Sequence, residues 1–235
     1  MVRIDGRGFT RLTKEALPLE RPFDPRFRAL MEATARHLMR CGFRAVFAYA
    51  QSDEISLLLH RGESAYGRSL RKWVSVLAGE ASACFSAGLR ELGFGEALGA
   101  FDARVCPLPA EETVVDYFRW RARDAFRNAV GAHAYWALRG EGMDAREATR
   151  RLEAMGNAER QELLFRRGTN VDALPGWQKR GLGLWWVEEA RQATNPKTGE
   201  AVTATRRRLR VEEALPRGEP FAKLVRARVA EARSM

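Results

Sequence analysis

The sequence predicts an α+β fold, because short apolar runs of strand length alternate with longer segments of helical periodicity. In chain order we expect a strand at 2–5, a helix at 24–41, a hairpin at 45–59, a helix at 66–92 and a strand at 101–105. This βαββαβ order is the ferredoxin-like arrangement, which polymerase palms and nucleotidyl cyclases share.

Each segment carries a local signal for its structure. Asp24-Pro25 is typical of a helix start, with an N-cap followed by proline in the first turn. The apolar run that begins at Ala45 is interrupted by Gln51–Glu54, which indicates two strands joined by a polar turn. The first strand, Val2–Asp5, is shorter than the usual ~5–6 residues, so we expect the natural protein to start further upstream.

The rest of the chain predicts helical additions rather than a separate domain. An arginine- and aromatic-rich helix is expected at 112–139, two short helices follow to about residue 166, and a basic strand or arm is expected at 202–211. We therefore expect a palm-type catalytic domain over 1–187, with helical elaboration over about 112–166. A basic C-terminal extension over 188–235 is expected to pack on the same domain.

Composition favours a nucleic-acid partner. The 235 residues carry a formal net charge of +10, and 46% of them are hydrophobic, enough for a substantial core. Arginine-rich genome composition would explain the charge but not its clustering. No run approaches the ~20 apolar residues of a membrane span, and no secretion leader is recognisable. The three cysteines lack metal-ligand spacing, so we expect reduced thiols in a cytoplasmic protein.

Two carboxylates mark the expected reactive site. Asp5 ends the first strand and is followed by glycines, while Asp53 lies in the predicted hairpin turn. A turn aspartate often serves only its own backbone. Together, however, these carboxylates suit a two-metal site, in which divalent ions ~3.5–4 Å apart hold attacking and leaving oxygens. Mg²⁺ favours such carboxylates together with substrate phosphate oxygens.

Basic residues crowd the expected start of the helix at 66–92. Arg68, Arg71 and Lys72 fall there, and cations at a helix N-terminus oppose the helix dipole unless an anion binds nearby. A solvated charged surface explains the same pattern equally well.

Three segments together resemble the tRNA-His guanylyltransferase family and its bacterial and archaeal relatives, the Thg1-like proteins. They are Arg3–Phe9 (R-I-D-G-R-G-F), Tyr49–Glu54 (Y-A-Q-S-D-E) and Phe101–Val105 (F-D-A-R-V). The likeness continues through 116–138 and 174–186. The resemblance implies an enzyme that adds nucleotides to the 5′ end of tRNA, works on a polymerase palm and assembles as a homotetramer.

The resemblance also implies roles for particular residues. Two Mg²⁺ ions would be held by Asp5, the Gly6 carbonyl and Asp53, with Glu54 as a further catalytic residue. ATP or GTP would serve as substrate, and its triphosphate would be bound by Arg7, Gly8, Phe9, Thr10, Arg21, Ser52, Arg68 and Lys72. RNA would be bound by Arg121, Arg127, Asn128, Lys179, Arg180, Arg206, Arg207 and Arg208, where either Lys179 or Arg180 fills the family's basic position.

One departure from the family pattern bears on the substrate. True guanylyltransferases carry a motif resembling H-I-N-N-L-Y-N, whereas this chain has Phe126 at the histidine position and retains only Asn128 of the asparagines. His133, one turn further on, is a weak substitute. The difference favours template-dependent 5′-end repair over addition of an extra G to tRNA-His. A nucleotidyl cyclase and a non-enzymatic RNA-binding protein remain alternatives.

Overall fold

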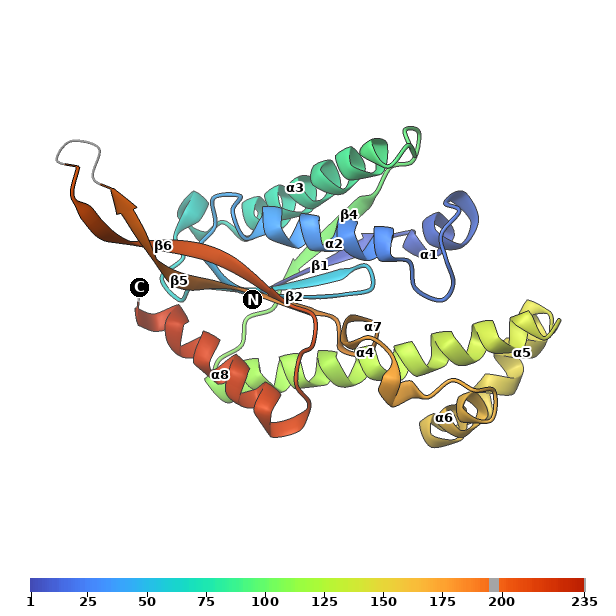
Figure 1. Cartoon of the computed structure of the whole chain (residues 1–235). Coiled ribbons are helices and arrows are strands. Elements are labelled where there is room, and N and C mark those ends of the chain that lie inside the picture. Colours follow the sequence, from blue (N-terminus) through green and yellow to red (C-terminus); the bar gives the residue numbers. More distant parts are fainter. Residues whose placement is uncertain (195–198, 235) are drawn as a thin grey trace.

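The structure is a computed structural model that describes residues 1–194 and 199–234. Within these residues, one antiparallel six-stranded sheet has the strand order β4-β1-β3-β2-β5-β6 (Figure 1). The strands are β1 (Val2–Arg7), β2 (Ala45–Gln51), β3 (Glu54–Leu59), β4 (Ala100–Val105), β5 (Leu182–Thr194) and β6 (Ala201–Glu212).

Helices cover both faces of the sheet (Figure 1). On one face lie α2 (Pro25–Leu38) and α3 (Leu70–Glu91), and on the other lie α4 (Glu111–Gly140) and α8 (Gly218–Ser234). The shorter helices are α1 (Phe9–Arg11), α5 (Ala145–Glu153), α6 (Asn157–Phe165) and α7 (Gly176–Arg180). None of the helices in the described ranges is long and apolar enough to cross a membrane.

Side chains that alternate along the strands form two apolar layers. Ile4 and Ile55 point into the layer that α2 and α3 cover, whereas Phe47 belongs to the layer shared with Phe118 of α4 and Phe221 of α8. All residues of β3, and all but the last of β2, are buried, as expected for central strands with helices on both sides. A third apolar cluster joins α4 to α5 and α6.

The predicted α+β class is confirmed. The predicted hairpin, the helices over 24–41 and 112–139 and the strand over 101–105 are all present, with differences of a few residues at their ends. The first strand continues to Arg7 and has six residues, so the shortness from which we inferred an upstream start is not observed.

One predicted boundary is wrong. The second long helix begins at Leu70, because Tyr66, Gly67 and Arg68 all have positive φ and form a separate turn. The basic strand predicted over 202–211 is confirmed as β6, which forms a long hairpin with β5 and is followed by α8, a helix that was not predicted.

Asp24 organises the start of α2. Its buried carboxylate accepts the backbone N–H of Glu20 at 2.8 Å, of Arg26 at 2.7 Å and of Phe27 at 3.4 Å, and the Arg26 guanidinium lies 2.6 Å away. Burial alone would raise the pKa of Asp24. The Arg26 guanidinium and the three N–H groups outweigh burial and lower this pKa to about 2.

We predict that Asp24→Ala lowers the free energy of unfolding at pH 7 by about 2 kcal/mol, because α2 loses its N-cap and Glu20 N–H loses its acceptor. The folded-state pKa lies below the unfolded value of ~3.9. The ionic part of this stabilisation is therefore complete above about pH 5 and is lost as the pH falls through 4 towards 2. Urea unfolding at several pH values measures both effects.

Asp144→Ala is the matched control. Asp144 caps α5 in the same way, through Arg146 N–H and Glu147 N–H at 2.8 and 2.9 Å, but is exposed. We expect its loss to cost less than ~1 kcal/mol. Equal losses for the two variants would contradict the additional role given to Asp24.

Candidate active site

The β2–β3 turn brings the two predicted carboxylates together. Ser52, at a φ of 52°, and Asp53 form the turn, and Asp5 of β1 pairs across the sheet with Glu54 at the start of β3. The Gly6 N–H donates to the Asp53 carbonyl at 3.0 Å, which joins β1 to the turn. Asp5 and Asp53 therefore lie at the same end of the sheet.

Only glycine fits at position 6. A Cβ there would lie 2.5 Å from the Phe9 ring and 2.9 Å from the Asp53 Cβ, and these contacts are too short to be relieved without moving buried groups. Gly8 follows with a φ of 74° and turns the chain into α1. The Asp-Gly-Arg-Gly sequence thus fixes the backbone against the aspartate turn.

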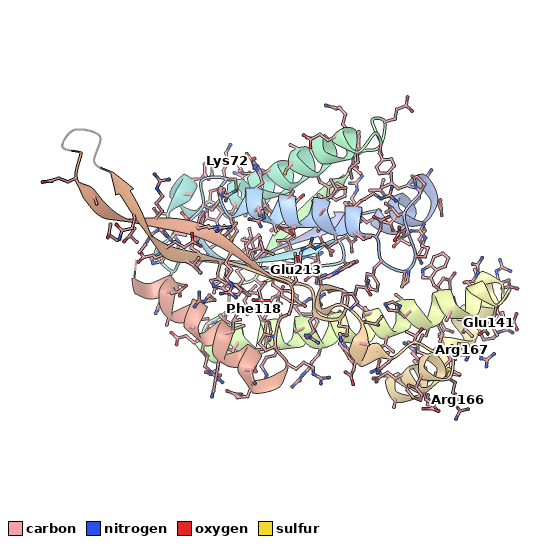
Figure 2. The ribbon with its side chains drawn as sticks, in the orientation of Figure 1. Lys72, Phe118, Glu141, Arg166, Arg167 and Glu213 are labelled. Carbon is pink, nitrogen blue, oxygen red and sulfur yellow. The ribbon has the colours of Figure 1, made fainter. Side chains whose placement is uncertain are left out.

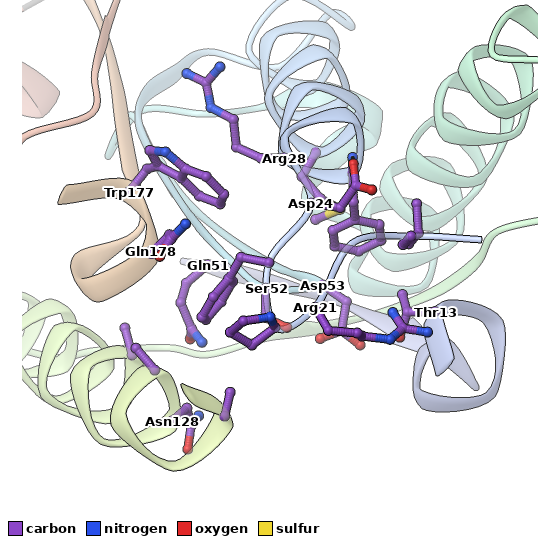
Figure 3. Close-up of a pocket in the computed structure, with 18 of the residues that line it drawn as sticks. Thr13, Arg21, Asp24, Arg28, Gln51, Ser52, Asp53, Asn128, Trp177 and Gln178 are labelled. Carbon is purple, nitrogen blue, oxygen red and sulfur yellow. The ribbon is translucent and has the colours of Figure 1, made fainter. Parts of the chain in front are cut away.

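A cavity of about 640 Å³ opens beside the aspartate turn. Figure 3 shows its wall, which comprises Ser52 and Asp53 of the turn, Arg21 of the loop before α2, Asn128 of α4, and Trp177 and Gln178 of α7. Phe9 and Thr10 also line it. The structure therefore places four of the eight residues predicted to bind a triphosphate on the cavity wall: Phe9, Thr10, Arg21 and Ser52.

Cations and aromatic rings meet at the mouth of this cavity. The Arg21 guanidinium lies 5.2 Å from the centre of the Trp136 ring, and the Lys14 ammonium lies 5.5 Å from that of Tyr135. These contacts bridge the segment after α1 to α4, and both cations line the cavity. Neither aromatic residue nor Lys14 was predicted; their positions depend on how α4 packs, and the local sequence carries no distinct signal for them.

The donor set beside the cavity fits a magnesium ion. Burial raises the pKa of Asp53, and the nearby Asp5 carboxylate adds to the increase, while Arg3, which lies 3.1 Å from Asp5, opposes it. Two carboxylates therefore lie close together at this end of the sheet. Two carboxylates and the Gly6 carbonyl are oxygen donors of the kind Mg²⁺ prefers. Among the described residues, no cluster of three or more acidic, histidine or cysteine side chains could hold a metal ion, so phosphate oxygens or water would have to complete the coordination.

Glu54 is held in a buried ion cluster. The Arg121 Nε and Nη2 each lie 2.8 Å from a different Glu54 oxygen, and Arg3 Nη2 lies 2.6 Å from Glu54 and 3.1 Å from Asp5. Burial raises the pKa of Glu54, while Arg121 and Arg3 oppose the increase. Ser56 and Tyr117, 2.9 Å apart, extend the polar contact between β3 and α4.

This cluster corrects one prediction and reinterprets another. Arg121 is only 5% exposed and is bound to Glu54 and Asp124, so it does not face RNA. Glu54 is likewise 5% exposed, with both oxygens occupied by guanidinium groups. Its contacts are those of a structural anion that joins α4 to the sheet.

Three further residues predicted to bind the triphosphate lie outside the cavity wall. Arg68 and Lys72 are not at the site, because α3 starts after β3 has run away from the aspartate turn; neither lines the cavity, and Figure 2 shows Lys72 near the start of α3. Arg68 instead donates to the carbonyls of Arg61 and Glu63. Arg7 is exposed beside Gly8.

The residues predicted to bind RNA differ in their exposure. Lys179 is 5% exposed, and its ammonium donates to the Asp172 carbonyl at 2.6 Å, so it is not available to RNA. Arg180 donates to the Leu215 carbonyl. Arg127 and Asn128 are exposed on α4, and the remaining three, Arg206, Arg207 and Arg208, are exposed on the β5–β6 hairpin that projects from the sheet in Figure 1.

Fold and site define a class of α+β proteins in which two aspartates lie at one end of an antiparallel sheet and one of them, Asp53, lines a cavity together with cationic side chains. Residues 1–109 match the family described as tRNAHis guanylyltransferase, and residues 112–217 match that described as Thg1 C terminal domain. The chain belongs to the tRNA-His guanylyltransferase family.

Curated relatives agree with this assignment. The chain is 32% identical to the tRNA(His) guanylyltransferase of Neurospora crassa over 77% of its own length and 64% of that protein. It is 30% identical to the probable tRNA(His) guanylyltransferase of Dictyostelium discoideum over 90% of its length and 83% of that protein. The chain thus spans slightly less than two thirds of the Neurospora protein.

Solved structures show the same fold. A bacterial tRNA(His) guanylyltransferase (Thg1)-like protein in complex with ATP superposes with a TM-score of 0.76 at 27% identity, covering 97% of this chain and 88% of that one. The corresponding GTP complex gives 0.69 at 26% identity, covering 97% and 87%. The Saccharomyces cerevisiae enzyme gives 0.70 at 26% identity, covering 77% and 82%.

We predict that Arg121→Met lowers the free energy of unfolding by about 3 kcal/mol, because it leaves the buried Glu54 carboxylate with one partner instead of two. The double variant Arg121→Met/Glu54→Gln should be less destabilised than the sum of the two single variants. Denaturant unfolding of the four proteins measures this coupling.

Arg104→Met provides the control. Arg104 is more than half exposed and lies 3.6 Å from Asp102 and 4.0 Å from Asp5, so its loss should cost less than ~1 kcal/mol. Additive losses in the double variant would show that Arg121 and Glu54 do not stabilise each other.

Proposed function

We propose that this chain is a nucleotidyltransferase that adds nucleotides to the 5′ end of tRNA and restores missing ones against the complementary strand. The observation that carries this proposal is that Asp53 lines a cavity with cationic side chains and is joined through Gly6 to the strand that carries Asp5. Membership of the guanylyltransferase family supports it. The strand order β4-β1-β3-β2 and the βαββαβ connection are those of a ferredoxin-like palm, which further supports it.

The proposed site uses two Mg²⁺ ions. Asp5, the Gly6 carbonyl and Asp53 would hold them, and when bound they would neutralise charge on the transferring phosphoryl group. The assignment of these three groups as magnesium ligands is supported by their oxygen donors and by the proximity of the two carboxylates. Glu54 would contribute by holding Arg3 beside Asp5 rather than by binding metal.

ATP or GTP would bind in the cavity. The neighbouring bacterial structures are described as complexes with ATP and with GTP, and the cavity here has room for a nucleotide. Phe9 and Thr10 line the cavity together with Ser52 of the aspartate turn, and backbone groups from Gly8 to Thr10 would bind the triphosphate there. Arg21 and Lys14 would neutralise its charge.

In the proposed reaction, the 3′-hydroxyl of the incoming nucleotide attacks the activated 5′ phosphate of the RNA. A phosphodiester bond forms, and the bond to the departing adenylate or pyrophosphate breaks. The chain's own residues orient the two ends: the cavity holds the nucleotide, and the fixed turn keeps Asp53 beside Asp5. Lysine and arginine side chains that neutralise the negative charge on the departing phosphate group would stabilise the transition state electrostatically.

Template-dependent repair is preferred over G addition because of Phe126. This residue packs in the apolar cluster between α4, α5 and α6 and does not line the cavity. His133 is not a free substitute, because it hydrogen-bonds to Gln178 at 3.1 Å and lies against Phe23. Burial lowers the pKa of His133 and favours its neutral form.

RNA would contact the exposed basic residues outside the cavity. Arg127 is exposed on α4 beside Asn128, which itself lines the cavity, and Arg206–Arg208 extend along the β5–β6 hairpin. A net charge of +10 supports a polyanionic partner. The homotetramer is proposed from family resemblance.

The function is tested with a tRNA that lacks its first nucleotide, incubated with Mg²⁺ and each nucleoside triphosphate in turn. We expect extension only by the nucleotide complementary to the acceptor strand. Preferential G addition on tRNA-His opposite a non-complementary base would indicate a guanylyltransferase. A cyclic product from ATP or GTP alone would indicate a cyclase.

We predict that Asp53→Asn lowers the rate of nucleotide addition at least ~1000-fold, because half of the paired negative charge is removed. Asp102→Asn is the control: Asp102 pairs with Asp5 across β4 and β1, but its side chain is 54% exposed and does not line the cavity. Single-turnover extension and filter binding of tRNA separate chemistry from binding. Equal rates for the two variants would refute the role of Asp53.

A further inference from the structure

An exposed tryptophan lies beside the carboxylate site. Trp120 of α4 is 47% exposed, although most other large aromatic residues of the described chain are buried or half-buried. A single exposed aromatic residue is common on protein surfaces, so the contacts of the Trp120 ring, and not its exposure alone, indicate what it can do.

A series of side-chain contacts connects this indole to the aspartates. The Trp120 ring centre lies 4.6 Å from the Arg121 guanidinium carbon, Arg121 binds Glu54, and Arg3 joins Glu54 to Asp5. Tyr117, 5.9 Å away, packs edge-on against the same ring. The indole is thus the exposed end of the buried ion cluster.

The cavity and Trp120 occupy successive parts of α4. The cavity is lined from Ala125 to Trp136, whereas Trp120 precedes Ala125 by five residues, about 7.5 Å along the axis. Trp120, Asp124 and Asn128 follow at i+4 intervals, so they form one line along the helix that ends in the cavity wall. Asn128 donates to Asp124 within that line at 3.4 Å.

Nucleotide addition joins two substrates at the aspartates. A nucleotide in the cavity occupies the C-terminal side of this line, so the RNA end has to approach from elsewhere. The Trp120 side offers an exposed aromatic ring, and Arg127, whose side chain is 59% exposed and pairs with Asp124 at 2.8 Å, follows about two turns further along the same helix face. Aromatic rings are the usual platforms for unpaired bases and for RNA ends.

We propose that Trp120 is the platform on which the 5′-terminal base of the RNA stacks during nucleotide addition, and that Arg121 fixes its ring. This inference rests on the proposed function and adds to it the side from which RNA enters. The ligand is an RNA terminus, recognised by its aromatic base face and not by its sequence. Arg127 neutralises a backbone phosphate beside it.

The test uses a tRNA acceptor-stem hairpin with 2-aminopurine as its 5′-terminal nucleotide, bound to the full chain without nucleoside triphosphate. Stacking on an indole quenches 2-aminopurine fluorescence. We expect quenching with the wild-type chain, partial quenching with Trp120→Phe and none with Trp120→Ala. The Kd of the Trp120→Ala variant for this RNA should rise on the order of ten-fold, while its Kd for ATP stays within two-fold.

Phe165→Ala is the matched control, because Phe165 is 66% exposed on α6 and lies outside the cavity and the ion cluster. It should change neither quenching nor RNA affinity. Unchanged quenching and affinity in Trp120→Ala would overturn the proposal. A parallel loss of ATP binding and of thermal stability in that variant would also overturn it, since Trp120 would then only support the fold.

Failure of this inference is distinguishable from failure of the proposed function. If the wild-type chain extends tRNA and Trp120→Ala behaves like wild type, only the platform is wrong. If the wild-type chain extends no RNA but the fluorescence of the terminal 2-aminopurine is still quenched through Trp120, the RNA-binding site is supported and the proposed reaction is wrong.

Discussion

The buried contact between Arg121 and Glu54 is the constraint on which the site depends. A carboxylate that is 5% exposed needs compensating charge, and here the charge comes from α4, 67 residues away in sequence. Because Arg121 must reach Glu54, the following turns of α4 are held against the aspartate turn. Those turns supply Ala125, Asn128 and Trp136 to the cavity wall.

The carboxylates themselves were predictable because their geometry is local. A two-residue turn between buried strands places Asp53 at the end of the sheet whatever the rest of the chain does. Gly6 is similarly determined, since contact with Phe9 and Asp53 leaves no room for a side chain. Residue spacing within a few positions puts Asp5 at the end of a strand and Asp53 in a turn, whereas the joint role of Asp5, Gly6 and Asp53 was implied by the family resemblance.

Residues whose role depends on long-range packing were predicted less well. The local sequence around Arg121 and Lys179 does not distinguish them from exposed cations. Both are nevertheless buried, Arg121 in an ion pair with Glu54 and Lys179 in a hydrogen bond to the Asp172 carbonyl. Arg68 and Lys72 were assigned to the site by resemblance, but the direction of β3 carries them away from it. α8 did have a signal, since Phe221, Val225 and Val229 recur at helical spacing; its many arginines obscured this pattern.

Phe126 shows how a change in the family motif can act at a distance. The family's histidine position is occupied here by a ring that packs against α5 and α6, while Ala125 and Asn128 on the same helix face the cavity. A substitution at position 126 therefore alters the packing of the helical elaboration and not the nucleotide wall. In the proposed function, any influence of this position on the choice of RNA would be exerted through the placement of α5 and α6 relative to α4, and RNA selection and nucleotide binding would then be separable properties of one helix.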